Sequence, residues 1–312
     1  MDRRYALGFL AGFLALSTTK SLANPKFKKG IKIGYLPICD HLIIIAKDIF
    51  SSDEFTITPI KFSNWADLSE ALRAKAIDAA FLLAPLGLML KGSGVDIKAI
   101  MAAHKNGSAL VANKKIKSIK ELNGKNIAIP SRFSSHYYIL HHLLTKYNIK
   151  VNLVDMAPTE MPFALLTNKV DAYIVAEPFG QLAVKRGAVN LILSKDVVPN
   201  HICCLLNYSN ELANSKVANQ LTKAFKLAAN FIEKNHSEAA TIGSKILAQD
   251  ANIINKIISE KIVSYSDLKI NKEDLINLKE FLISQNLAND GLRNLDIDSY
   301  LVEQVWNIFI KV

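Results

Sequence analysis

The sequence predicts an α/β protein of two similar lobes, with mixed, mostly parallel sheets, a hinge of two chain crossings, and a helical C-terminal tail packed on lobe one. Residues 71–87 (ALRAKAIDAAFLLAPLG) recur 93 positions later at 164–180 (ALLTNKVDAYIVAEPFG), and the same offset joins Pro37 to Pro130. Short apolar segments also alternate with helical ones until about residue 207. A unit that occurs twice indicates two lobes, and a cleft between lobes usually holds a small ligand.

The N-terminus predicts an export signal, residues 1–23, that is cleaved from the mature protein. Arg3 and Arg4 precede an apolar run at 5–16, and small residues follow up to Ala23. This run is short for a membrane span, which disfavours the alternative of an N-terminal anchor. Both the Sec and the twin-arginine routes fit, so we expect an exported protein and leave the route open.

The expected strands are short apolar runs, most of them entering helical segments. They are Ile31–Leu36, Thr56–Phe62, Asp78–Leu83, Ile97–Ala102, Ser108–Ala112, Asn126–Ile129, Val151–Asp155, Asp171–Ala176, Asn190–Ser194 and Ile202–Asn207. From residue 210 onward the strand patterns stop and helical spacing predicts Val217–Ile232, Leu275–Ile283 and Tyr300–Ile310. We therefore assign residues 27–110 and 206–312 to lobe one and 111–205 to lobe two.

Composition excludes several classes of function. The chain has 312 residues and a net charge of +10, but its lysines are mostly single and spaced, so we expect no nucleic-acid binding. Three cysteines do not form a disulfide framework. Since there is no nucleotide-binding, nucleophile-elbow, CxxC or HxxxH motif, we assign no catalytic residue, no cofactor and no metal.

Lobe one offers polar residues where its strands end, which is where sheets of this type bind ligands. Asp40, after Cys39, is suited to cap the next helix, either to present its amides to a ligand or as a plain cap. Trp65 offers a flat face and one donor, although a Trp at a helix start is as often a core residue. Asn106 and Ser108 flank a glycine, as in an anion-binding nest.

Lobe two offers a second set at the same edge. Ser134 or Ser135 can cap the helix that opens there, and His136 in its first turn can donate to a ligand. Glu177 stands where the first repeat has Ala84, so its carboxylate is the best candidate for a functional charge. The alternative is a surface Glu that caps the following helix.

The sequence His201-Ile202-Cys203-Cys204 lies beside the second crossing. Ligand contact, soft-metal binding and redox chemistry are all open for His201 and Cys203. The alternative is that these cysteines are small residues buried in a strand.

Five segments in this order resemble the periplasmic solute-binding proteins of the nitrate, bicarbonate, sulfonate and taurine importer family. They are GYLPICDHL, FSNWADLSEALRAKAIDAAFLLAPL, HKNGSAL, SRFSSHYYILHHLL and DAYIVAEPFG. The resemblance implies the type 2 two-lobed binding-protein fold and a monomer that hands a small solute to an ABC permease in the inner membrane. It also places Trp65, His136 and Glu177 in the pocket. The lysines that surround the oxyanion in the nitrate branch have no counterparts here, so an aminopyrimidine, an amine-bearing sulfonate or bicarbonate fits better than nitrate.

Two other classes remain open. A pyrimidine-synthesising enzyme of thiamine biosynthesis shares this fold and is also rich in His and Cys near its cleft, but an export signal argues against an enzyme. The second is a metal or thiol-redox protein built on Cys39, Cys203 and Cys204.

Overall fold

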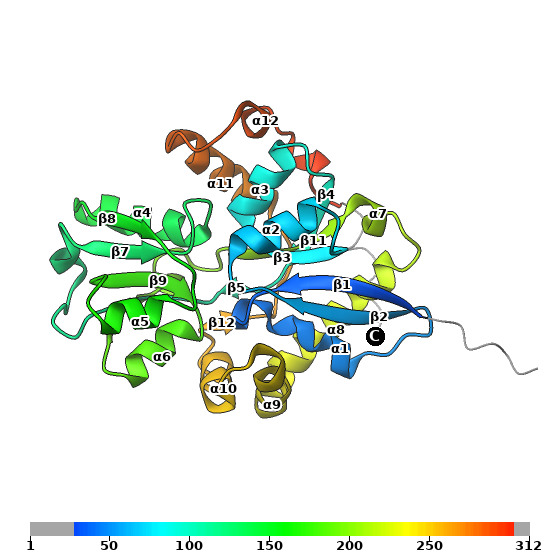
Figure 1. Ribbon diagram of the computed structural model, residues 1–312, viewed down its shortest axis with the longest axis horizontal. Coiled ribbons are helices and arrows are strands. Elements are labelled where there is room, and N and C mark those ends of the chain that lie inside the picture. The colour runs from blue at the N-terminus through cyan, green and yellow to red at the C-terminus, as the bar shows by residue number, and fades with distance from the viewer. Residues whose placement is uncertain (1–27, 303–312) are drawn as a thin grey trace, which may run out of the picture.

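The computed structural model describes residues 28–302, which form two lobes side by side, each built on one five-stranded sheet (Figure 1). The export signal expected at 1–23 lies outside these residues. Within 28–302, none of the helices combines the length and the apolar character that crossing a membrane requires.

The sheet of lobe one has the order β2-β1-β3-β11-β4. Its strands are β1 (Lys29–Tyr35), β2 (Phe55–Lys61), β3 (Ala79–Leu83), β4 (Ile97–Ala102) and β11 (Cys204–Ser209). The sheet of lobe two has the order β10-β6-β9-β7-β8. Its strands are β6 (Ser108–Ala112), β7 (Asn126–Ile129), β8 (Asn152–Asp155), β9 (Ala172–Ala176) and β10 (Val189–Leu193).

Both sheets are mixed, as predicted, but parallel pairing is less dominant than expected. In lobe one β1 runs parallel to β2 and β3, while β11 is antiparallel to both of its neighbours. Lobe two likewise pairs β7 in parallel and β6 antiparallel. The reason is the hinge: β6 and β11 each follow a crossing and enter the sheet from the other lobe.

The repeated aspartates, Asp78 and Asp171, have a structural role. The strands β3 and β9 start and end at equivalent positions of the repeat, and the aspartate before each accepts a bond from the neighbouring strand. Asp78 accepts from the amide of Lys32 at 2.7 Å, and Asp171 accepts from the amide of Asn126 at 2.9 Å. The repeated Asp therefore ties β3 to β1 and β9 to β7, rather than serving a ligand.

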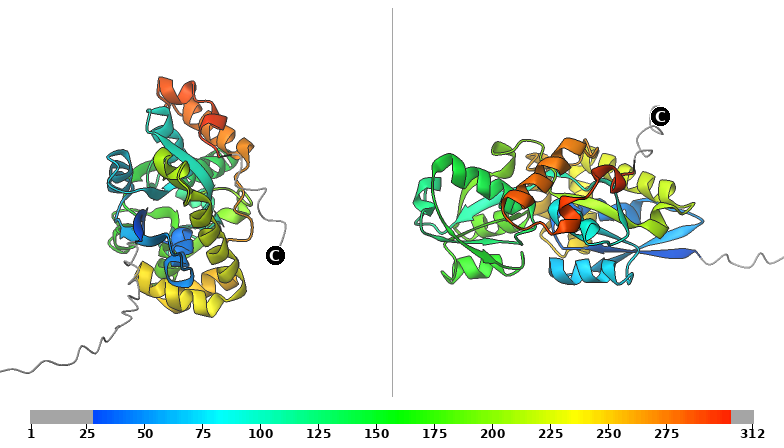
Figure 2. Two further views of the ribbon diagram at one scale, coloured as in Figure 1. Left: turned by 90° about the vertical axis from the view of Figure 1, so that its right-hand side faces the viewer. Right: turned by 90° about the horizontal axis from the view of Figure 1, so that it is seen from above.

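Helices cover the sheets on both faces (Figure 2). In the first 200 residues they are α1 (Ala46–Ile49), α2 (Trp65–Arg73), α3 (Ala84–Gly92), α4 (Ser135–Tyr147), α5 (Met161–Leu166) and α6 (Phe179–Lys185). Short 3-10 helices are η1 (Cys39–Ile45), η2 (Ile119–Leu122), η3 (Ser194–Asp196) and η4 (Ile297–Ser299). The tail adds α7 (Asn210–Ala213), α8 (Ala218–Lys234), α9 (His236–Leu247), α10 (Ala251–Ser259), α11 (Lys272–Ser284) and α12 (Asp290–Arg293).

The tail packs on lobe one, as predicted, with α8 and α9 against η1 and with α11 and α12 against α3. One expectation for it is wrong, because a two-residue strand, β12 (Val263–Ser264), pairs with β5 (Lys105–Asn106) beside the hinge (Figure 1). Strands this short lack the periodicity that predicts them. Most of the helix expected at Tyr300–Ile310 lies outside the described residues, and Leu301 forms a bridge with Ala99. The domain boundaries given above remain a prediction. Below, Ser108 is counted with lobe two and Cys203 and Cys204 with lobe one, after the sheets that β6 and β11 join.

Candidate functional site

A cluster of buried polar side chains lies where the two lobes meet, at the carboxyl ends of the strands. Several of its atoms have no hydrogen-bond partner. They are Asp40 Oδ1, His41 Nε2, Trp65 Nε1, His104 Nδ1 and Nε2, His136 Nδ1, Glu177 Oε1 and His201 Nε2. Buried polar atoms are nearly always paired in native proteins, so a concentration of unpaired ones indicates a place where a ligand supplies the partners.

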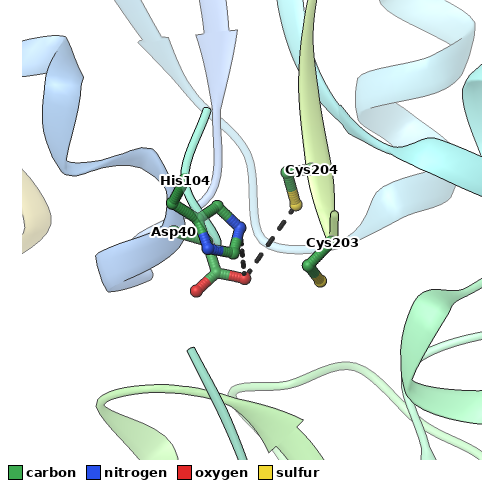
Figure 3. A group of neighbouring side chains, drawn as sticks. All are labelled: Asp40, His104, Cys203 and Cys204. Atoms are coloured by element: carbon green, nitrogen blue, oxygen red, sulfur yellow. Dashed lines mark hydrogen bonds and ion pairs between the residues drawn. The ribbon is translucent and has the colours of Figure 1, made fainter. Parts of the chain in front are cut away.

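Four of the buried residues form a group that we call the donor cluster: Asp40, His104, Cys203 and Cys204 (Figure 3). Asp40 lies on η1, and His104 lies two residues after the end of β4. Cys203 precedes β11, and Cys204 is its first residue. His104 Nε2 is 3.1 Å from Asp40 Oδ2, and the Cys204 thiol is 4.0 Å from the same oxygen. One candidate ligand atom from each residue lies within 4.8 Å of all the others.

Asp40 does not act as the helix cap that the sequence suggested. The N-cap of η1 is Ile38, which makes no side-chain bond, and Asp40 lies within the helix. Its carboxylate is turned toward His104 instead. A glycine leaves room on this side: a Cβ at Gly107 would lie 2.8 Å from Asp40 Oδ1 and 3.1 Å from His104 Nδ1.

Burial and neighbouring charges shift the pKa values of the ionisable side chains in the cluster. Burial alone would lower the pKa of His104, but the Asp40 carboxylate raises it to about 10, so the two form an ion pair. Burial, reinforced by neighbouring imidazoles, lowers the pKa of His136 to about 3. Burial likewise lowers the pKa of His201 to about 4, so both rings are neutral near pH 7. Burial raises the pKa of Glu177 to about 7.

The two thiols differ. Hydrogen bonding from Cys204 lowers the pKa of the Cys203 thiol against the effect of burial, while burial raises the pKa of Cys204 well above its usual range. All three cysteines are free and buried. The Cys39 thiol is not part of the donor cluster, and the backbone of Cys39 carries its polar contacts, since its carbonyl accepts from the Tyr265 hydroxyl at 2.6 Å.

Lobe two closes the site from the other side through α4 and α6. Ser134 caps α4 by accepting from the amide of Tyr137, as expected, which leaves Ser135 and His136 in the first turn. Ser135 Oγ donates to the Cys203 carbonyl at 3.2 Å, and His136 Nε2 lies 3.1 Å from Ser108 Oγ. Of the two candidate caps, Ser134 is the one used, and Ser135 reaches across to lobe one.

Glu177 is both a helix cap and an open acceptor. Its Oε2 accepts from the amide of Gln181 at the start of α6, while Oε1 has no partner. Glu177 is fully buried, so the alternative of a surface residue is wrong. The bond to the following helix that this alternative expected is present. The repeat glycine Gly180 lies against it, since a Cβ there would be 2.8 Å from Oε1.

The other predicted residues lie at the rim of the cluster. Trp65 is 5% exposed and lines an open groove of about 490 Å³, whose other wall includes Phe133 and Met156 of lobe two. Asn106 takes a left-handed conformation (φ 63°) and accepts from the amide of Asn200, so it shapes the hinge. His201 Nδ1 bonds to the Val198 carbonyl, and its Nε2 is unpaired.

Three residues were missing from the predicted ligand-binding set: His41, His104 and Cys204. Of these, Cys204 was named only in the metal or redox alternative. His104 lies two residues after the end of a predicted strand, so its position was a usable signal. His41 packs face to face on Phe81, with ring centres 5.1 Å apart, and its Nδ1 accepts from the amide of Leu36. The grouping of His104 with Cys204 has no sequence signal, because the donors come from three distant segments.

A family model described as the NMT1-like family matches residues 24–248. The chain is 22% identical to the nitrate import ATP-binding protein NrtC of Synechocystis sp., over 83% of this chain and 43% of that protein. It therefore spans less than half of that relative's length.

Solved structures have the same fold. A ligand-binding component of an ABC-type import system from Staphylococcus aureus, with zinc bound, gives a TM-score of 0.82 at 28% identity, over 89% of this chain and 98% of that one. The alkanesulfonate-binding protein SsuA from Xanthomonas axonopodis pv. citri, bound to MOPS, gives 0.73 at 15% identity, over 88% and 98%. These matches confirm the predicted fold class and the resemblance to importer binding proteins.

Proposed function

Because this chain belongs to the NMT1-like family, we propose that it is the periplasmic solute-binding component of an ABC importer. It captures a small solute between its lobes and delivers the solute to a membrane permease. The observation that supports this most strongly is the group of unpaired buried polar atoms contributed by both lobes and the hinge. This arrangement lets a ligand hold the lobes together, which is how binding can drive hinge closure.

The chemistry of the cleft favours a solute that donates hydrogen bonds or carries positive charge. Apart from histidines, the buried charged residues among 28–302 are Asp40, Lys105 and Glu177. Lys105 lies near the carboxylates of Asp267 and Asp274. His104 is occupied by Asp40, so a bare oxyanion such as nitrate would meet no unpaired cation. Of the candidates, an aminopyrimidine or an amine-bearing sulfonate satisfies Glu177 better than nitrate or bicarbonate does.

The energy required is modest. Micromolar capture needs about −8 kcal/mol. Hydrogen bonds to charged groups contribute about 1.5–3 kcal/mol each, and the unpaired atoms above supply several of them before the cost of ordering is deducted.

A metal ion is a second candidate solute. It is favoured by the donor cluster, and the S. aureus importer component was solved with zinc. An enzyme of the pyrimidine-synthase type has no comparable support from the matched proteins, which are transport components.

A thermal-shift screen of the purified protein tests the proposal. The panel is nitrate, bicarbonate, taurine, alkanesulfonates, aminopyrimidines and divalent metals, the organic and oxyanion arms being run with a chelator present. At 100 times its dissociation constant, the true solute adds about 2.7 kcal/mol of stability and raises the melting temperature. A panel in which no compound shifts the melting transition contradicts the proposal.

A further inference from the structure

The donor cluster deepens the proposed function, on which this inference rests. We propose that the solute is a divalent transition-metal ion of borderline softness, above all Zn²⁺. It is bound on lobe one by Asp40, His104, Cys203 and Cys204, and lobe two covers it.

Geometry is the first argument. One donor atom from each of the four residues lies within 4.8 Å of all the others. Bonds of about 2.0–2.3 Å in a tetrahedral zinc site hold the ligands roughly 3–4 Å apart. Small side-chain movements are therefore enough to close the cluster on one ion.

Donor type is the second argument. The set of two sulfurs, one imidazole nitrogen and one carboxylate oxygen matches what zinc and similar ions bind. Magnesium and calcium require mostly oxygen ligands and do not fit it.

Unsatisfied atoms are the third argument. Asp40 Oδ1 and both nitrogens of His104 have no hydrogen-bond partner, although all are fully buried. His104 Nε2 and Asp40 Oδ2 are 3.1 Å apart, a close contact of opposite charges that does not meet hydrogen-bond geometry. Two donor atoms at this separation can bind one metal ion, which would supply the partner that His104 Nε2 lacks.

Contacts from lobe two make the ion a cargo that is enclosed on closure. Ser135 Oγ on α4 donates to the carbonyl of Cys203 at 3.2 Å, and the carbonyl of Glu177 accepts from the amide of Cys39, next to Asp40, at 2.7 Å. Both contacts reach segments that carry metal donors. Closure of lobe two is therefore coupled to the arrangement of the donors, as expected for a solute that is loaded on one lobe and released on opening.

The test is metal binding by the purified, reduced and chelator-treated protein, with Zn²⁺ measured by competition and Co²⁺ as a spectroscopic probe. We expect one Zn²⁺ per chain at sub-micromolar affinity, and a Co²⁺ complex with thiolate-to-metal absorption in the near ultraviolet. Cys204→Ser and His104→Gln should each weaken Zn²⁺ binding at least about 100-fold, since losing a ligand costs more than losing one of its supporting partners. His236→Gln, which alters a histidine on α9 outside the cleft, should leave the affinity unchanged.

The opposite results overturn the inference. A Co²⁺ complex of the wild-type protein that shows no thiolate absorption overturns it, and this result does not depend on whether a variant folds. Unchanged Zn²⁺ affinity in both folded variants overturns it too. If the protein does not bind Zn²⁺ but an organic solute or oxyanion stabilises the chelator-treated protein, the metal inference is wrong and the proposed importer function stands. If no solute of either kind binds, both fall.

Discussion

At the scale of single residues, the proposed site concentrates side chains that the fold leaves incompletely bonded. Glu177 uses one carboxylate oxygen to cap α6 and keeps the other unpaired, and Trp65 keeps its indole N–H unpaired while lining the interlobe groove. Leaving a buried polar group unsatisfied costs about 1–3 kcal/mol. That cost is removed when a bound solute supplies the partner.

Replacing these residues should weaken solute binding. Trp65→Ala and Glu177→Ala are each expected to lower the affinity for the solute found in the screen by at least about tenfold, or 1.4 kcal/mol. Isothermal titration gives the affinities. Phe163→Ala and Glu160→Ala, both at exposed positions on or beside α5, are the matched controls. Unchanged affinity in both test variants would mean that the solute binds elsewhere.

The raised pKa of Glu177 predicts a pH dependence of stability. Burial raises this pKa from 4.5 to about 7, so the folded state holds a proton that the unfolded state has lost between these values. Without ligand, the contribution of Glu177 to stability should therefore be fully present below pH 4.5. It should be lost, by up to about 3 kcal/mol, as the pH rises through 7. Denaturant unfolding at several pH values measures it. Glu177→Gln should flatten the curve in this window, and a slope equal to wild type would contradict the assignment.

At the scale of elements, the sequence predicted the strands well and the short hinge pieces poorly. β4, β6 and β7 begin and end where expected, because each is a buried apolar run bounded by polar or turn residues. The pieces β5 and β12 were missed, since two-residue strands depend on tertiary contacts rather than periodicity. The capping role expected for Asp40 was wrong because His104, 64 positions away, attracts its carboxylate. Local patterns thus give elements, whereas the donor cluster depends on how distant segments meet.

The repeat predicts equal effects at its two aspartates. Asp78 and Asp171 each accept a backbone amide from the neighbouring strand, in lobe one and lobe two respectively. Asp78→Ala and Asp171→Ala should each cost about 1 kcal/mol, a typical value for one such bond. Urea denaturation gives the values. Asp53→Ala, at an exposed position, should change little. A large effect at one aspartate and none at the other would show that the repeat is not equivalent in its energetics.

At the scale of the whole molecule, contacts of the tail with lobe two hold the lobes together. On α4, the Tyr137 hydroxyl donates to Gln285 at 2.8 Å, and its ring packs edge-on against Phe281 of α11. Lys256 on α10 donates to Gln181 on α6 at 3.0 Å. The tail is therefore more than a support for lobe one, because it also shares in interlobe contact.

Loss of an interlobe contact should weaken binding without touching the solute. Gln285→Ala removes its bond to Tyr137 and is expected to reduce the affinity about 2- to 10-fold, as one hydrogen bond of 0.5–1.5 kcal/mol implies. Gln220→Ala is the matched control, because Gln220 bonds to Ser52 within lobe one. Small-angle X-ray scattering should show a more compact protein with solute than without it. Equal affinities for both variants would mean that these contacts do not contribute to the bound state.

The position of β11 sets the order in which the chain can assemble. Lobe two is continuous from β6 to β10, whereas β11 is the strand that joins β3 to β4 in lobe one. During synthesis, lobe two can fold as soon as residue 193 has emerged. Lobe one has to wait for residues 204–209, and until then β3 and β4 expose open edges that invite aggregation. A nascent chain stalled between these points would have a finished second half and an unfinished first half.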